Sequence, residues 1–278
     1  MRRILEILTF IAFAAVVAQA QRPEPGDHDD DSPAQSGYAV ITPTGGAGTG
    51  LVVFETFGLR GNGADGGASQ AGVLPAALTT NAILFIESSG RLSKNLGVAI
   101  VNPNGSTVNV TMTLRKSDGA QLVTTSITVP SHQQVSKYVT QLFSSSLQSD
   151  FIGTLAVTSS LPVSVIGLRF RGLNFSIVPV TSLSNTTTSL PVIATGVGGN
   201  GAILLPQFAA GGGWATEIVA GNAGTSSLTV RVDLFKDDGT PFTTTLDGRR
   251  ASSFTNLTIP AGGVLTLAPR DRNGDDDF

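Results

Sequence analysis

The sequence contains no cysteine, two histidines and one tryptophan. Without cysteine the chain forms no disulfide and offers no thiolate as a nucleophile or a metal ligand. The histidines, His28 and His132, are far apart in the sequence, and neither has a convincing partner for acid–base catalysis. These absences predict a protein that is not an enzyme and has no catalytic residues, metal site or cofactor.

Charged residues are also few. Lys and Arg number 17 and Asp and Glu number 20, which gives 13% of the chain and a formal net charge of −3. Such a chain has no basic field to hold nucleic acid or anionic lipid, so neither is an expected partner. By contrast, 41% of the residues are hydrophobic and 33 are glycine, with abundant Thr and Ser, which predicts an all-β protein with a neutral polar surface.

The first twenty residues have the pattern of a secretory signal peptide. Arg2 and Arg3 are followed by an apolar stretch at 8–17 and by the small-x-small sequence Ala18-Gln19-Ala20. A membrane-spanning helix needs about 20 apolar residues, roughly twice what is present. The pattern therefore predicts cleavage after Ala20, an extracellular protein, and no membrane span after cleavage.

An internal repeat organises the rest. Asn102–Gly119 aligns without gaps with Asn222–Gly239, and seven of eighteen positions are identical. Both copies alternate apolar and polar residues and end in Asp-Gly, which is typical of a half-buried strand followed by a tight turn. The chain therefore uses one β module twice.

The first copy is predicted to be complete. Strands are expected near 96–101, 106–115, 121–129, 153–158, 163–170 and 174–180. Ser131-His132-Gln133-Gln134 has capping-box spacing after Pro130, and apolar residues follow at i, i+3 and i+4, which predicts one short crossover helix over about 132–144.

The second copy is predicted to form strands near 203–208, 215–220, 227–236, 240–246, 253–259 and 263–268. It lacks the last strands of the module, and the N-terminus contains a similar segment. Tyr38–Phe54 aligns with Leu155–Arg171, sharing Ala39/Ala156, Val40/Val157, Gly50/Gly167 and Leu51/Leu168. Because an incomplete sandwich leaves open strand edges, the N-terminal hairpin (37–57) is expected to complete the C-terminal half within the same chain. Two alternatives remain: these strands extend the central module, or they are donated between chains by strand exchange.

The resulting domain organisation has seven parts. They are a signal peptide (1–20), a disordered acidic and Pro-rich spacer (21–36), N-terminal strands predicted to pair with the C-terminal half (37–83), a complete central sandwich (84–183), a linker (184–201), a C-terminal sandwich half (202–269) and an acidic tail (270–278).

Several motifs have the spacing of known ligand-binding or modification sites. Gly61/Gly63/Gly66 and Gly196/Gly198/Gly201 match a dinucleotide fingerprint, but neither opens a helix in a βαβ unit. The tail Asp271–Asp277 loosely resembles a calcium loop but lacks its Glu. A solvated acidic tail is therefore predicted, and weak calcium binding is the alternative. Asn-x-Ser/Thr sequences occur at Asn104, Asn109, Asn174, Asn185 and Asn256 and are glycosylation acceptors only where the source modifies such sites.

Two further hypotheses concern ligands and catalysis. Trp214 follows three glycines and could stack on a sugar ring, which would make the protein a polysaccharide-binding module; packing in the core is the more common role. A hydrolase would need a cleft with two carboxylates about 5–10 Å apart. The acids expected in the folded part are Glu55, Glu87, Asp118, Asp150, Glu217, Asp233, Asp237, Asp238 and Asp247.

Three phrases, LGVAIVNPNGSTVNVTMTLRKSDG, GTLAVTSSLPVSVIGLRFRG and LPQFAAGGGWATEIVAGNAG, resemble modules of secreted multi-module proteins of environmental bacteria. The resemblance implies immunoglobulin- or fibronectin-III-like β-sandwich modules, and it brings no catalytic residues. The expected fold is therefore two tandem immunoglobulin-like sandwiches, and the expected role is adhesion, matrix structure or cell-surface interaction with an extracellular protein or polysaccharide.

Overall fold

The computed structural model describes residues 36–42, 44, 51–59, 69–144, 146–147, 150–172, 174–183, 203–211 and 215–269. The predicted signal peptide, linker and acidic tail, and the spacer up to residue 35, lie outside these residues. No described helix has the length and apolar character needed to span a membrane.

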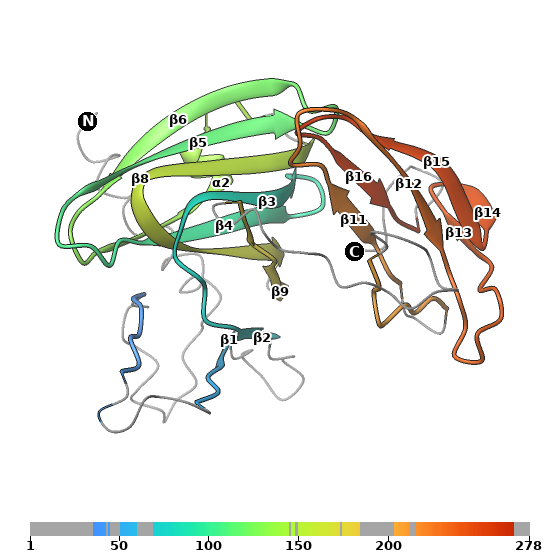
Figure 1. Ribbon diagram of the computed structural model, residues 1–278, viewed down its shortest axis with the longest axis horizontal. Helices are drawn as coiled ribbons and strands as arrows, with labels where there is room; N and C mark the ends of the chain where they lie inside the picture. The colour runs from blue at the N-terminus through green and yellow to red at the C-terminus, as the bar shows by residue number, and fades with distance from the viewer. Residues whose placement is uncertain are drawn as a thin grey trace.

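Eight of the sixteen described strands form one antiparallel sheet that curls strongly into a half-barrel (Figure 1). Two further strands join its main path: β7 (Gln134–Tyr138) pairs with β4 and β9 (Asn174–Val178) pairs with β8. The path itself runs in the order β10 (Thr181–Ser182), β3 (Thr79–Ser89), β4 (Lys94–Val101), β8 (Asp150–Arg171), β5 (Val108–Lys116) and β6 (Gln121–Val129).

The curl of the sheet follows the 22-residue strand β8. Its first half, up to Ser159, pairs with β3 on one edge and β5 on the other, whereas its second half, from Ser164, pairs with β4. Pro162 lies between the halves and has no N–H to donate to a neighbour, so the ladder is interrupted where the strand bends.

The core lies inside this curl. Alternate residues of β3, β4, β5 and both halves of β8 face inward, as the strict alternation of the sequence predicts. The four inward residues of β5, Val108, Val110, Met112 and Leu114, are each 0% exposed. Gly167 allows the two layers to approach closely, because a Cβ there would lie 2.8 Å from Leu84 Cδ2.

The expectation of tandem immunoglobulin-like sandwiches is wrong. Such a sandwich divides its strands between two separate sheets, whereas β8 here is hydrogen-bonded to strands of both layers and makes them one sheet. The strands predicted at 153–158 and 163–170 are accordingly parts of one strand. The all-β class is confirmed.

The helix predicted over 132–144 is mostly wrong. Residues 134–138 form β7, which pairs with β4 from Gly97↔Tyr138 to Val101↔Gln134. Only α2 (Val139–Leu142) is helical, and the Gln141 side chain accepts a hydrogen bond from the Tyr138 N–H at 2.9 Å. Residues 134–138 form a strand despite their helical spacing, because pairing with the edge of β4 gives them main-chain hydrogen bonds, whereas a short isolated helix is only marginally stable.

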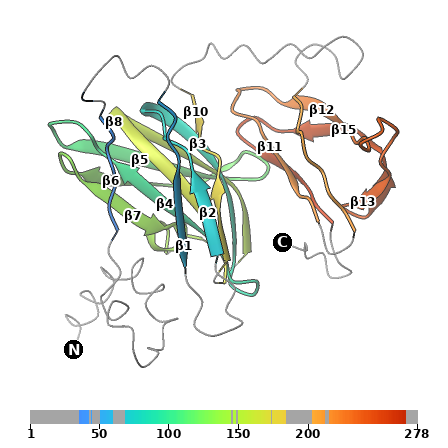
Figure 2. The same cartoon turned by 90° about the horizontal axis from the view of Figure 1, so that it is seen from below.

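The C-terminal half contains the second copy of the repeat (Figure 2). Pairing joins β11 with β16, β12 with β15, and β13 with β14. These strands are β11 (Ile218–Gly221), β12 (Leu228–Asp233), β13 (Thr244–Leu246), β14 (Arg249–Ala251), β15 (Ser253–Ile259) and β16 (Val264–Leu267). The strand predicted at 203–208 is not formed in these residues.

The described N-terminal residues lie beside the central sheet. β1 (Glu55–Leu59) pairs with β2 (Ser69–Val73), and the Phe175 N–H of β9 donates to Ser69 Oγ at 3.0 Å. No described strand pairing joins residues 36–59 to residues 203–269, where the sequence predicted one.

Candidate functional site

A buried asparagine begins the repeat and organises each copy. Asn102 is 0% exposed, and its side-chain amide donates to the main-chain oxygens of Ser106, Val129 and Pro130 at 2.8, 3.0 and 3.0 Å. Its Oδ1 accepts the N–H of Asn104 at 2.9 Å. The residue therefore ties the start of β5 to the end of β6.

Asn222 repeats this arrangement in the C-terminal half. Its amide donates to Ser226 O at 2.8 Å and Ile259 O at 3.0 Å, and its Oδ1 accepts the Gly224 N–H at 2.9 Å. The asparagine is 2% exposed. Since the same side chain makes the same contacts 120 residues apart, the repeat seen in the sequence is a repeat of structure.

The Asp-Gly turns also match. The Ala120 N–H donates to Asp118 Oδ1 at 2.8 Å, and the Thr240 N–H donates to Asp238 Oδ1 at 2.8 Å. The Thr240 hydroxyl adds a 2.6 Å bond, and this bond, helped by the main-chain one, lowers the pKa of Asp238 below its ordinary value. Both aspartates stabilise their turns by accepting main-chain hydrogen bonds, as the sequence predicted.

The two copies differ in how well their repeated strand is covered. β12 corresponds to β5, whose inward side chains are fully buried, yet Leu228 is 48% exposed and Val230 and Val232 are only half-buried. Among the described strands, β12 pairs with β15 alone, whereas β5 pairs with both β6 and β8. We call the side chains of Leu228, Val230 and Val232 the open face.

A second uncovered segment belongs to the same copy. Residues 82–84 and 202–204 are both Ala-Ile-Leu, again 120 positions apart. Ile203, Leu204 and Leu205 form no strand and are 70, 65 and 59% exposed, whereas Leu84 in β3 is 1% exposed. The strand predicted at 203–208 is missing because β3 is paired along β8, and the C-terminal half has no described strand in the place of β8.

Close contacts between turns hold the C-terminal half against the end of the central sheet. The Val264 N–H donates to Ser117 O at 3.0 Å, and Thr154 Oγ1 donates to Gly262 O at 3.2 Å. A Cβ on Gly119 would lie 2.0 Å from Ala261 O, so only glycine fits this approach. The open face is thus carried on a firmly attached unit.

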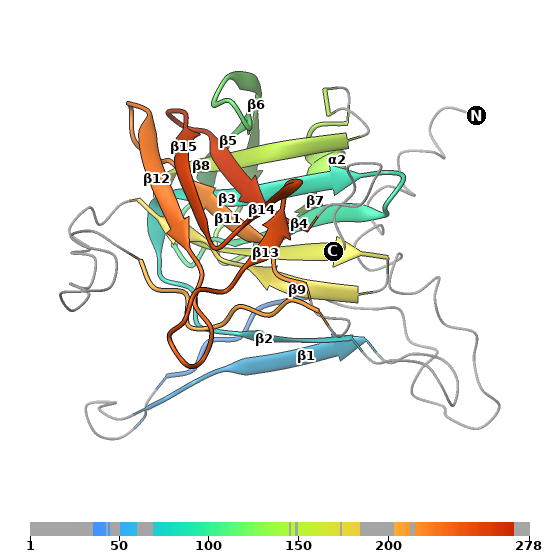
Figure 3. The same cartoon turned by 90° about the vertical axis from the view of Figure 1, so that its right-hand side faces the viewer.

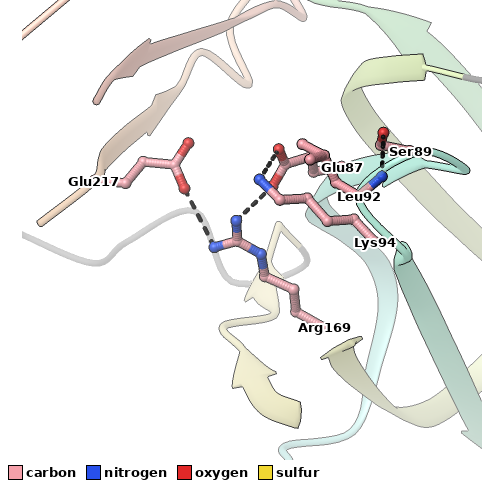
Figure 4. A network of polar contacts seen from close by, with 6 residues as sticks. All are labelled: Glu87, Ser89, Leu92, Lys94, Arg169 and Glu217. Atoms are coloured by element: carbon pink, nitrogen blue, oxygen red, sulfur yellow. Dashed lines mark hydrogen bonds and ion pairs between the residues drawn. The ribbon is translucent and has the colours of Figure 1, made fainter. Parts of the chain in front are cut away.

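A buried network of charges crosses the same junction (Figure 4). Glu87 accepts from Lys94 Nζ at 2.7 Å and from Arg169 Nη2 at 2.5 Å, and Arg169 Nη1 reaches Glu217 Oε2 at 3.2 Å. The side chains of Lys94, Glu87 and Glu217 are 0, 6 and 4% exposed, and that of Arg169 is 21% exposed. Two acids and two bases compensate one another, and Arg169 links β8 to the residue just before β11.

The network also bears on the hydrolase hypothesis. Of the acids named from the sequence, Glu87 and Glu217 are brought together, but the guanidinium of Arg169 bridges them. Both carboxylates are therefore engaged as ion-pair partners of the same arginine. The arrangement fits a structural junction.

Most of the other predicted site residues fall in parts of the chain that the structure does not describe. Trp214, the acidic clusters and the glycine motifs lie outside the described residues, so the sugar-binding and calcium hypotheses stay predictions. His132 contributes only its main-chain oxygen, which accepts the Tyr38 hydroxyl at 3.0 Å. Within the described part of the chain, no group of three His, Asp or Glu residues is placed to hold a metal ion.

Sequence reasoning missed the residues that matter most for the architecture. Asn102 and Asn222 are the identical first residue of the repeat, and this identity of a polar residue in both copies is the signal that could have found them. Arg169 and Glu217 gave no signal, because they lie 48 positions apart and meet only in the folded chain.

No family model and no curated protein matches the sequence. The chain is similar to several solved structures. One is the Anabaena sensory rhodopsin transducer, with 19% identity, 33% of this chain and 96% of that chain covered, and a TM-score of 0.28. Another is Thermotoga maritima 1070, with 14% identity, 37% and 90% covered, and a TM-score of 0.30. At these scores the likeness carries no argument about activity, and the expected immunoglobulin- or fibronectin-III-like resemblance finds no support in it.

Proposed function

We propose that the chain is a secreted, non-enzymatic all-β protein that acts outside the cell, in adhesion or matrix structure, by binding other polypeptides at the open face. One observation carries the proposal: inward side chains of β12 are exposed or half-exposed where those of β5 are fully buried. An uncovered strand with a free edge accepts a further strand through main-chain hydrogen bonds, and its side chains select the partner. The signal-peptide pattern of residues 1–20 supports a location outside the cell.

The experiment compares two substitutions on neighbouring residues of β12. Leu228→Asp places a charge on the open face, and Thr229→Asp places the same charge on the opposite, exposed face. Both are made in the full chain and expressed in the producing cells. The wild-type protein and Thr229→Asp should be retained at the cell surface or in the matrix, and Leu228→Asp should pass into the medium.

Equal retention of the two variants would contradict the proposal. Turnover of any substrate by the purified protein, abolished by a point substitution, would contradict its non-enzymatic part. The urea midpoints of both variants are measured first, so that a loss of retention is not confused with unfolding.

A further inference from the structure

The central half-barrel shows what covers the repeated strand when the module is complete. There, Leu155 and Val157 of β8 are 0 and 2% exposed. Leu155 lies opposite both Leu84 of β3 and Leu114 of β5. The first half of β8 thus fills the position between these two strands, and its two apolar side chains complete the core.

The C-terminal half has sequence counterparts of both neighbouring strands, and its described residues include no strand in the place of β8. With the repeat offset of 120, Leu204 corresponds to Leu84 and Leu234 to Leu114. A strand like β8 would pair with the main chain of the uncovered segment Ile203–Leu205 on one side and with the edge of β12, which carries the open face, on the other. The occupant that fits is therefore a segment resembling Leu155–Ser159.

The chain contains such a segment near its N-terminus. Tyr38–Thr42 reads YAVIT and Leu155–Ser159 reads LAVTS, at a constant offset of 117. Tyr38 replaces Leu155 and Val40 replaces Val157, so large apolar residues fall on the inward positions. The segment forms no strand, and Tyr38, Val40 and Ile41 are 43, 75 and 60% exposed.

Within one molecule this segment lies away from the C-terminal half. The Tyr38 hydroxyl donates to His132 O, and Ser69 Oγ accepts the Phe175 N–H, so two points along the N-terminal region contact the central sheet. Figures 2 and 3 show the N-terminal segments (blue) apart from β12 and β15 (orange to red). Closure within the chain, the arrangement favoured by the sequence, is not what the described residues show.

We propose that residues 37–42 of one molecule pair as a strand with the edge of β12 of a second copy of the chain, beside Val230 and Val232 of its open face. The inference rests on the proposed function and names the partner. Copying the central register places Tyr38 opposite Leu234 and Val40 opposite Val232. Because each molecule has one donor segment and one acceptor strand, the contact is head-to-tail and builds rings or filaments.

The first experiment uses two substitutions on the donor segment. Val40→Asp changes a residue that would face the core of the second copy. Ile41→Asp changes its neighbour, which aligns with the exposed Thr158 and would face solvent. Both side chains are exposed within one molecule, so neither change should affect the fold of the monomer. Light scattering after size exclusion, over a range of concentrations, should show assemblies for the wild type and Ile41→Asp, and a monomer for Val40→Asp.

The second experiment restores the missing strand. A synthetic peptide of residues 36–42 (SGYAVIT) is titrated into the monomeric Val40→Asp protein and followed by fluorescence anisotropy. Binding should be saturable and at least about tenfold weaker for the peptide that carries Val40→Asp, because burial of a valine is lost and a charge is introduced. The peptide that carries Ile41→Asp should bind like the wild type.

Three results would overturn strand exchange. They are a wild-type protein that is monomeric at every concentration, an equal effect of the two substitutions, and no binding of the wild-type peptide. If the protein is monomeric while Leu228→Asp still abolishes surface retention, strand exchange fails and the proposed function stands. If assembly follows the expected pattern but retention is unaffected, exchange stands and the surface role fails.

Discussion

Replacing the buried asparagine that begins each copy of the repeat tests whether the two copies are held together in the same way. Asn102→Ala removes three donated hydrogen bonds, to Ser106, Val129 and Pro130, and the bonds accepted from Asn104. Asn222→Ala removes two donated bonds and one accepted bond.

The magnitude follows from this count. A hydrogen bond contributes about 1 kcal/mol net, and a buried group left without its partner costs about 1–3 kcal/mol. Water can replace the partners that lie near the surface, so the free energy of unfolding should fall by about 3 kcal/mol for Asn102→Ala. The same reasoning gives about 2 kcal/mol for Asn222→Ala, which has fewer bonds to lose.

The assay is urea denaturation of the full chain, followed by circular dichroism in the β-sheet region. With a slope of about 2–3 kcal/mol/M, a loss of 3 kcal/mol lowers the midpoint by about 1–1.5 M. Asn102→Asp is the matched control, because it keeps the shape and the acceptor but turns the donor into a carboxylate facing three carbonyl oxygens. It should destabilise at least as much as alanine.

Two results would refute the reasoning. If Asn102→Ala lowers the stability by less than about 1 kcal/mol, the buried bonds are not what joins the two strands. If Asn102→Asp is as stable as the wild type, the donated bonds have no role.

Two further substitutions test the packing and the junction. Gly167→Ala should lower the free energy of unfolding by about 1–3 kcal/mol, because its Cβ would lie 2.8 Å from Leu84 Cδ2. Gly90→Ala is the control and should be close to neutral in the same urea assay, because no atom lies within 4 Å of its Cβ. Equal urea midpoints of the two variants would disprove the close approach. Arg169→Met should lower the free energy of unfolding by about 2–4 kcal/mol, because two buried carboxylates lose their shared cation. The control, Arg231→Met, breaks an ion pair whose arginine side chain is 57% exposed and should cost less than about 1 kcal/mol. A lower urea midpoint for Arg231→Met than for Arg169→Met would show that the network does not hold the junction.

Much of the local structure was predictable from alternation. Residues 121–129 and 253–259 are strands with the predicted bounds, and the predicted turns at Asp118 and Asp238 are present. These features depend on neighbours in the sequence: period-two patterning selects the strand, and Asp before Gly favours the turn. Only Val139–Leu142 of the helix expected at 132–144 is helical, because residues 134–138 pair with a long-range neighbour, β4.

The interaction surface was only partly predictable. The sequence indicated that the second copy is incomplete and that Tyr38–Phe54 resembles the missing strand. It could not indicate that the inward residues of β12 stay exposed or half-buried while the N-terminal segment lies by the central sheet. Strand pairing over more than a hundred residues depends on the competing edges, which exist only in the folded molecule.

The sequence by itself determined the all-β class, the repeat and the shortage of residues that carry catalysis or bind metals, because each follows from residue types and their spacing. Tertiary structure alone decided that one bent strand, β8, joins both layers into a half-barrel. It also decided that four charges from distant parts of the chain compensate one another at the junction, and that the second copy keeps an open face. The reason is the same in each case: these outcomes depend on which edges and charges meet in space, and the order of residues along the chain does not contain that information.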